Sequence, residues 1–199
     1  MRKISPVSFF LLAFLLLTIS VAMSISVFGQ GQPAASRIDD EFVKKQFGNQ
    51  FTMLAEMQPV IGDLDGDGAE DVAIAARCKN PMLDQSEHGY MVVDPYNDFF
   101  GYGDPRVTTT FSEAVPERRG LVVLIIHGKG PEGWRSATPK AKFVIVNLPY
   151  KAISVRKMKL RKKSIDAVYV EEAGNTGESS ALFFDGRKFK YVPMGGDME

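Results

Sequence analysis

Apolar residues alternate with polar ones, or continue unbroken for the length of a strand, along most of the chain after residue 50. The unbroken run Leu121–Ile126 predicts a central strand that is covered on both faces. The apolar spacing over 38–51 instead predicts a short amphipathic helix ended by Gly48. Further strands are expected at 54–61, 71–76, 90–93, 142–148, 152–158, 166–171, 180–184 and 188–192. The pattern indicates a mainly β, or α+β, single domain of antiparallel strands with one or two short helices.

Turn-forming residues mark two further features. Asp185-Gly186 lies between the last two expected strands and predicts a hairpin with a type I′ turn, which needs positive φ at both central residues. The stretch 78–106 is rich in turn chemistry, including Asn80-Pro81 and Asp94-Pro95, so we expect irregular structure around one short strand.

The first residues follow the layout of a secretory signal. Arg2 and Lys3 precede a hydrophobic run, and small residues stand before position 30. We therefore expect a signal peptide over 1–29, a flexible leader over 30–37 and a single domain over 38–199, exported to the periplasm or the extracellular space. The alternative is an uncleaved anchor, because residues 4–28 are long enough to span a bilayer, and only in that case do we expect a membrane contact.

Composition narrows the class of protein. The chain has 199 residues, 45% of them hydrophobic, which suits one domain with a substantial core. Its 24 basic and 24 acidic side chains balance, so we expect no nucleic-acid partner. Cys78 is the only cysteine, which excludes an internal disulfide. We expect Cys78 to be a small buried apolar residue after a strand; the alternative is a reactive thiol or an intermolecular bridge.

Acidic residues recur at even spacing between the strands expected at 54–61 and 71–76. With Asp63 as position 1, aspartates stand at positions 1, 3, 5 and 9, namely Asp63, Asp65, Asp67 and Asp71. Calcium takes six to eight hard oxygen ligands, and a short loop supplies them by curling around the ion. Gly68 permits the sharp bend. Four carboxylates held close together repel one another unless a cation joins them.

The expected ligand set is the four carboxylates, the carbonyl of Ala69 and water. Calcium fits such a set better than magnesium, which keeps more of its waters. The loop is not an EF-hand, because position 12 is Ile74 in place of a bidentate glutamate. The alternative is a solvated Asp-Gly turn that holds no metal.

The segment Gly62–Ile74 resembles the calcium loop of FG-GAP and VCBS-type repeats, which occur in integrin-like β-propellers and in many bacterial exported proteins. The resemblance implies that Asp63, Asp65, Asp67 and Asp71, together with the carbonyl of Ala69, hold the ion. A propeller needs several copies, and this chain has one. The resemblance therefore carries over the metal site and not a complete propeller.

The remaining features leave the function open. We expect a non-enzymatic, exported calcium-binding protein of unknown partner, with calcium stabilising the strand–loop–strand hairpin over 61–72. One alternative is a hydrolase of a cell-surface polymer, using Glu or His groups around 90–103. Another is an adhesion module that presents Trp134 or the basic run 156–163 to a protein or glycan at the cell surface. The basic run is better explained as an exposed strand end and turn. Trp134 is equally compatible with a stacking platform and with a lid over the core.

Overall fold

The computed structural model describes residues 37–101, 119–160, 163–172 and 179–194. The described residues from Ile38 onward form one compact unit. The expected signal peptide or anchor, and all of the expected leader except Arg37, lie outside the described residues. Among the helices that are described, none has the length and apolar character needed to cross a membrane.

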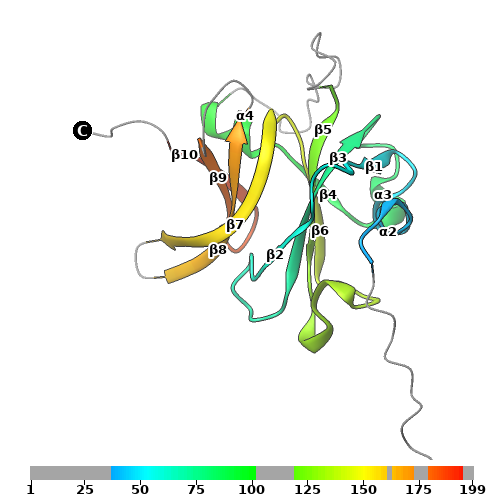
Figure 1. Ribbon diagram of the computed structural model, residues 1–199, viewed down its shortest axis with the longest axis horizontal. Helices are drawn as coiled ribbons and strands as arrows, with labels where there is room; N and C mark the ends of the chain where they lie inside the picture. Colours follow the sequence, from blue (N-terminus) through cyan, green and yellow to red (C-terminus); the bar gives the residue numbers. More distant parts are fainter. Residues whose placement is uncertain (1–36, 102–118, 161–162, 173–178, 195–199) are drawn as a thin grey trace, which may run out of the picture. The chain divides into compact units, whose positions relative to one another are not determined.

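Two sheets make up the described fold (Figure 1). The strands of the first sheet run in the order β1-β3-β5-β6-β4, with β2 also paired to β3. Those of the second run in the order β10-β9-β8-β7. The bounds of the first sheet are β1 Phe51–Met53, β2 Val60–Gly62, β3 Asp71–Cys78, β4 Met91–Val93, β5 Leu121–His127 and β6 Ala141–Ile145. The bounds of the second are β7 Tyr150–Leu160, β8 Lys163–Glu172, β9 Ser180–Phe184 and β10 Phe189–Pro193.

All strand pairs are antiparallel except β4 with β6, which are parallel. The described residues form no closed barrel or propeller, so the predicted mainly β fold class is confirmed. Their helices are α2 Asp40–Phe47, α3 Gln85–His88, α4 Pro95–Phe100 and the 3-10 helix η2 Gly130–Arg135.

The first sheet is covered on both faces. Along β3, Ala73 and Ala75 belong to the core between the two sheets, which also contains Val168 and Leu182 of the second sheet. The alternate residues of β3 belong to a second core, in which α2 covers the opposite face (Figure 1). Every residue of β5 is buried, because β5 lies between β3 and β6 under both layers. Leu121–Ile126 is therefore the central strand, as predicted.

Helix α2 confirms the predicted amphipathic helix, with ends set by its caps. The side chain of Asp39 accepts a hydrogen bond from the N–H of Phe42 at 2.9 Å and begins the helix. Gly48 ends it with φ of 100°. Val43 and Phe47 are the buried positions between these ends.

Two of the expected segments differ from the structure. Of the strand expected at 54–61, only Val60 and Ile61 lie in a strand, β2. Residues 54–59 instead connect β1 to β2 and include a turn, in which the N–H of Met57 donates to the carbonyl of Leu54. The expected irregular stretch contains α3 and α4 beside β4, and α4 begins where Asp94 caps the N–H of Asn97. Residues 102–106 of that stretch lie outside the described residues.

The hairpin expected at Asp185-Gly186 is present, but its type I′ turn is wrong. Phe184 pairs with Phe189, so the connection contains four residues and not two. Gly186 has φ of 98°, whereas Asp185 is not among the described residues with positive φ. Asp185 instead closes the loop with its side chain, which accepts the N–H groups of Arg187 and Lys188.

Candidate metal centre

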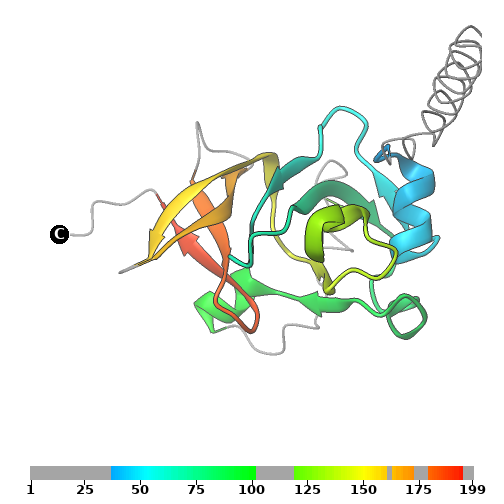
Figure 2. The same cartoon turned by 90° about the horizontal axis from the view of Figure 1, so that it is seen from below.

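The acidic loop joins β2 to β3 at one end of the first sheet. Gly62 pairs with Asp71 in the last register position, so the two strands enter and leave the loop side by side. The helix η2 lies at the same end (Figures 1 and 2) and contacts the loop where the N–H of Trp134 donates to the carbonyl of Glu70 at 2.7 Å. The loop therefore rests on ordered structure below it.

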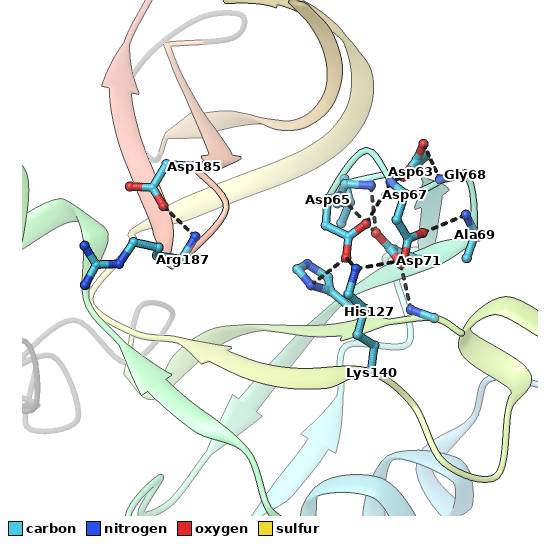
Figure 3. Close-up of polar contacts among 12 residues, drawn as sticks. Asp63, Asp65, Asp67, Gly68, Ala69, Asp71, His127, Lys140, Asp185 and Arg187 are labelled. Carbon is cyan, nitrogen blue, oxygen red and sulfur yellow. Dashed lines mark hydrogen bonds and ion pairs between the residues drawn. The ribbon is translucent and has the colours of Figure 1, made fainter. Parts of the chain in front are cut away.

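The loop is curled by its own carboxylates (Figure 3). The N–H of Asp67 donates to Asp63 Oδ1 at 3.0 Å and to Asp65 Oδ1 at 3.1 Å. The N–H of Gly68 donates to Asp63 Oδ2 at 3.0 Å, and that of Ala69 to Asp67 Oδ1 at 2.8 Å. Hydrogen bonds of this kind, from backbone N–H groups to nearby aspartate side chains, hold the loop in a tight turn.

Three of the predicted ligands come together. One carboxylate oxygen from each of Asp63, Asp65 and Asp67 lies within 4.8 Å of the others. Gly66 and Gly68 have φ of 76° and 87°, the left-handed conformation that a tight curl requires and that glycine adopts at least cost. Ala69 joins the loop through its N–H, and the role of its carbonyl as a ligand stays a prediction.

The fourth predicted ligand, Asp71, lies beneath the loop with none of its surface exposed. Its Oδ2 accepts the N–H groups of Leu64 at 2.8 Å and Asp65 at 3.2 Å, and its Oδ1 accepts that of Gly128 at 2.7 Å. Burial raises the pKa of Asp71 to about 7, against the opposing effect of these donors. Asp71 lies in a second cluster, in which one ligand atom each from Asp65, Asp71 and His127 lies within 4.8 Å of the others. Asp65 belongs both to this cluster and to the one it forms with Asp63 and Asp67.

A lysine that sequence reasoning missed reaches into the loop. Lys140 Nζ lies 2.7 Å from Asp65 Oδ2 and 2.8 Å from Asp67 Oδ2 (Figure 3). Hydrogen bonds to these two carboxylates raise the pKa of Lys140. The hydrogen bond from Lys140 is also the main cause that lowers the pKa of Asp67. No local signal marks Lys140, because it is 75 residues from Asp65 in the sequence.

His127, the last residue of β5, forms the inner wall of the site. Its side chain is 1% exposed, and its Nδ1 lies 3.5 Å from Asp65 Oδ2. The ring packs against Phe143, Phe184 and Phe189, with centroid separations of 5.0, 4.7 and 5.5 Å. Its Nε2 is buried without a hydrogen-bond partner among the described residues. Burial lowers the pKa of His127, so the neutral ring is favoured.

The other candidate features are structural. Trp134 is only 2% exposed, packs edge-on against Phe42 and lies under the guanidinium of Arg135, so it is a lid over the core, and an exposed stacking platform is ruled out. The basic run 156–163 covers the end of β7 and the start of β8, as expected for a strand end. Residues 161–162 of the run lie outside the described residues. Within it, Lys157 pairs with Asp166 at 2.9 Å and Arg156 stacks on Tyr169.

The glutamates and histidines that could in principle act as acid or base groups in a hydrolase are engaged in structural contacts or lie far apart in the fold. Glu171 pairs with Lys151 at 2.7 Å, and Glu172 accepts the hydroxyl of Tyr191 at 2.7 Å. His88 lies in α3, beside α2, whereas His127 ends β5 against the aromatic core between the sheets. The described positions of these residues therefore do not support a catalytic function.

Chemically, the loop offers a compact set of hard oxygen atoms next to a buried imidazole. Three carboxylates, opposed by a single ammonium group, leave two negative charges without a counter-charge in the group. Such a set suits a divalent cation bound through oxygen. In comparisons with known proteins, no family model, curated protein or solved structure matched this chain.

Proposed function

We propose that this protein is an exported, non-enzymatic calcium-binding protein, in which the ion stabilises the strand–loop–strand hairpin between β2 and β3. The observation that carries the proposal is the convergence of Asp63, Asp65 and Asp67 within 4.8 Å at the tip of a single curled loop. The resemblance of the loop sequence to FG-GAP and VCBS-type calcium loops supports the same choice of ion.

The donor atoms favour calcium among the common cations. Asp63, Asp65 and Asp67 offer only oxygen, which hard cations prefer and softer transition metals do not require. Asp67 and its neighbouring glycines are exposed, so water can complete the shell of six to eight ligands that calcium takes. The group keeps a net negative charge even with Lys140 paired to it, and this charge attracts a divalent cation.

Binding at this loop would stabilise more than the loop itself. The N–H of Asp63 donates to Asp166 Oδ2 of β8 at 2.9 Å, so the loop contacts the second sheet. A Cβ on Gly62 would approach Val155 Cγ1 of β7 to 2.6 Å, which shows how closely β2 lies against that sheet. An ion that orders the loop therefore supports the contact between the two sheets, and binding to the folded state alone raises stability by mass action.

Thermal unfolding with calcium and with chelator tests the proposal. At about 100 times the dissociation constant, calcium should add about 2.7 kcal/mol, which corresponds to a rise in Tm of about 5–10 °C. The Asp63→Asn variant should lose most of that rise, because it removes one ligand charge and does not touch Lys140.

Asp185→Asn is the matched control for the Asp63→Asn variant. Asp185 accepts two backbone N–H groups in an exposed Asp-Gly turn, as Asp63 does in the loop, but it lies outside the carboxylate group. This control should keep the calcium-dependent rise. A wild-type Tm that is the same with calcium and with chelator would refute the proposal, as would an undiminished rise in Asp63→Asn.

One observation favours a second role for the same ion, the shaping of a binding surface. A cavity of about 610 Å³ is lined by Asp65, by Leu160 and Ile165 of the β7–β8 hairpin, and by Phe183 and Phe184 of β9. Its size suits a small ligand or a short glycan. Calcium-dependent binding in a screen of cell-surface glycans, abolished in Asp63→Asn, would support this role. Binding that persists in chelator would assign it to some other feature of the protein.

A further inference from the structure

The cation site already holds a positive charge that belongs to the chain. The Lys140 ammonium lies between Asp65 Oδ2 and Asp67 Oδ2, at 2.7 and 2.8 Å. These are charge-assisted hydrogen bonds of ordinary length. The two oxygens are on the carboxylates that are grouped with Asp63 as a candidate ligand set. Lys140 and a metal ion therefore compete for the same carboxylates.

The backbone of Lys140 is held in place independently of the loop. Its N–H donates to the carbonyl of His127 at 2.9 Å, directly beside the His127–Ala141 pair of β5 and β6. Its side chain is 48% exposed, so the ammonium approaches the loop from solvent at the end of a flexible stem. The fixed backbone keeps the ammonium at a high effective concentration next to the loop, and the exposed stem leaves it a path away.

We propose that Lys140 is a tethered counter-ion that occupies the acidic loop in the absence of calcium and is expelled when calcium binds. This inference rests on the proposed function, since it names the residue that regulates the same site. A calcium ion within about 2.3–2.6 Å of both oxygens leaves no room for an ammonium at hydrogen-bonding distance from them, and the two cations repel each other. Lys140 thus lowers calcium affinity and keeps the empty loop folded.

Lys140→Met tests the proposal, because methionine keeps an apolar stem of similar length and removes the charge. The matched control is Lys151→Met. Lys151 is 64% exposed and pairs with Glu171 at 2.7 Å, so its replacement changes the net charge by the same amount outside the acidic loop. Calcium binding to the full chain is measured by calorimetry for wild type and both variants.

The expected result is that Lys140→Met binds calcium about tenfold more tightly than wild type, while Lys151→Met binds as wild type does. In chelator, Lys140→Met should melt below wild type, because three carboxylates then lack their counter-charge. With saturating calcium this deficit should disappear.

The outcomes separate this inference from the proposed function. Equal calcium affinity in all three proteins would overturn the role of Lys140 and leave calcium binding in place. Calcium binding by Lys140→Met but not by wild type would support the role of Lys140 and refute calcium binding as the function of the natural chain. Absence of binding in all three would overturn both.

Chemical labelling of amines gives a second readout. Brief treatment with acetic anhydride, followed by mass spectrometry, compares Lys140 with Lys151 in chelator and in calcium. Calcium should increase the labelling of Lys140 severalfold and leave that of Lys151 unchanged, because only Lys140 loses its carboxylate partners. Labelling of Lys140 that is independent of calcium, in a protein shown to bind calcium, would contradict its expulsion.

Discussion

Asp71 Oδ1 accepts a hydrogen bond from the backbone N–H of Gly128 at 2.7 Å, across 57 residues of sequence. This bond joins the end of the acidic loop to the end of β5. Because Asp71 also accepts the N–H groups of Leu64 and Asp65, one buried carboxylate closes the loop from below and attaches it to the central strand. The surrounding fold therefore contributes directly to the shape of the loop.

The first prediction concerns Asp71→Asn. Asparagine offers one acceptor oxygen in place of two and turns an NH₂ group toward backbone donors, so at least one buried N–H loses its partner. We expect a loss of about 1–3 kcal/mol in the free energy of unfolding, measured by urea titration in the presence of chelator. Asp185→Asn, in an exposed turn, should lose much less. Equal losses would show that Asp71 has no special role in closing the loop.

The second prediction concerns the close approach at Gly128. A Cβ there would overlap the Glu70 carbonyl oxygen and the Gly133 backbone, neither of which is a flexible side-chain end. Gly128→Ala should therefore destabilise the protein by several kcal/mol or prevent folding, since the backbone has to move. Gly130→Ala is the control, because its Cβ would meet nothing within 4 Å and only its positive φ adds strain. A Gly128→Ala variant as stable as Gly130→Ala would contradict the packing described around η2.

Those parts of the structure that depend on local pattern were predictable from the sequence. The apolar run of β5, the alternation along β3 and the caps of α2 each contain their own signal within a few residues. The same holds for the acidic spacing of the loop, which brings Asp63, Asp65 and Asp67 together as expected. Hydrophobic periodicity and aspartate–backbone bonds act over short distances in sequence, so they can be recognised without knowing the fold.

The parts that were missed depend on contacts between distant segments or on ambiguous local chemistry. Lys140 and His127 reach the loop only because β5 ends and β6 begins beside it, and neither residue carries a motif. Asp94-Pro95 is typical of a turn, but an N-cap followed by proline equally well begins a helix, as it does for α4. In such cases tertiary context selects between local alternatives that have similar free energies.

The third prediction concerns the single cysteine. Cys78 ends β3 in the core under α2 and is 6% exposed, which agrees with the expectation of a small buried apolar residue. Burial raises the pKa of its thiol to about 12, so almost no thiolate is present at pH 8. A thiol reagent such as DTNB should react with the native protein at least about a hundredfold more slowly than with the urea-unfolded protein. Comparable rates would indicate an exposed, reactive thiol.

The fourth prediction concerns the pH dependence of the contact between α4 and β10. Asp98 of α4 accepts hydrogen bonds from Lys188 at 2.9 Å and from Lys190 of β10 at 3.1 Å, and these lysines hold the pKa of Asp98 below its ordinary value of 3.8.

A carboxyl whose pKa is lowered in the folded state adds stability above its unfolded pKa and loses it as the pH falls through the folded pKa. Asp98→Asn should therefore be less stable than wild type at pH 6–7, by up to about 1 kcal/mol because the pair is partly exposed, and the difference should shrink as the pH falls through 3.8 toward the lower pKa of the folded state. Urea titrations of both proteins across this range measure the difference, which should also shrink at high salt. A difference that is constant with pH would assign the effect of the substitution to the cap or packing of α4, and not to the charge of Asp98.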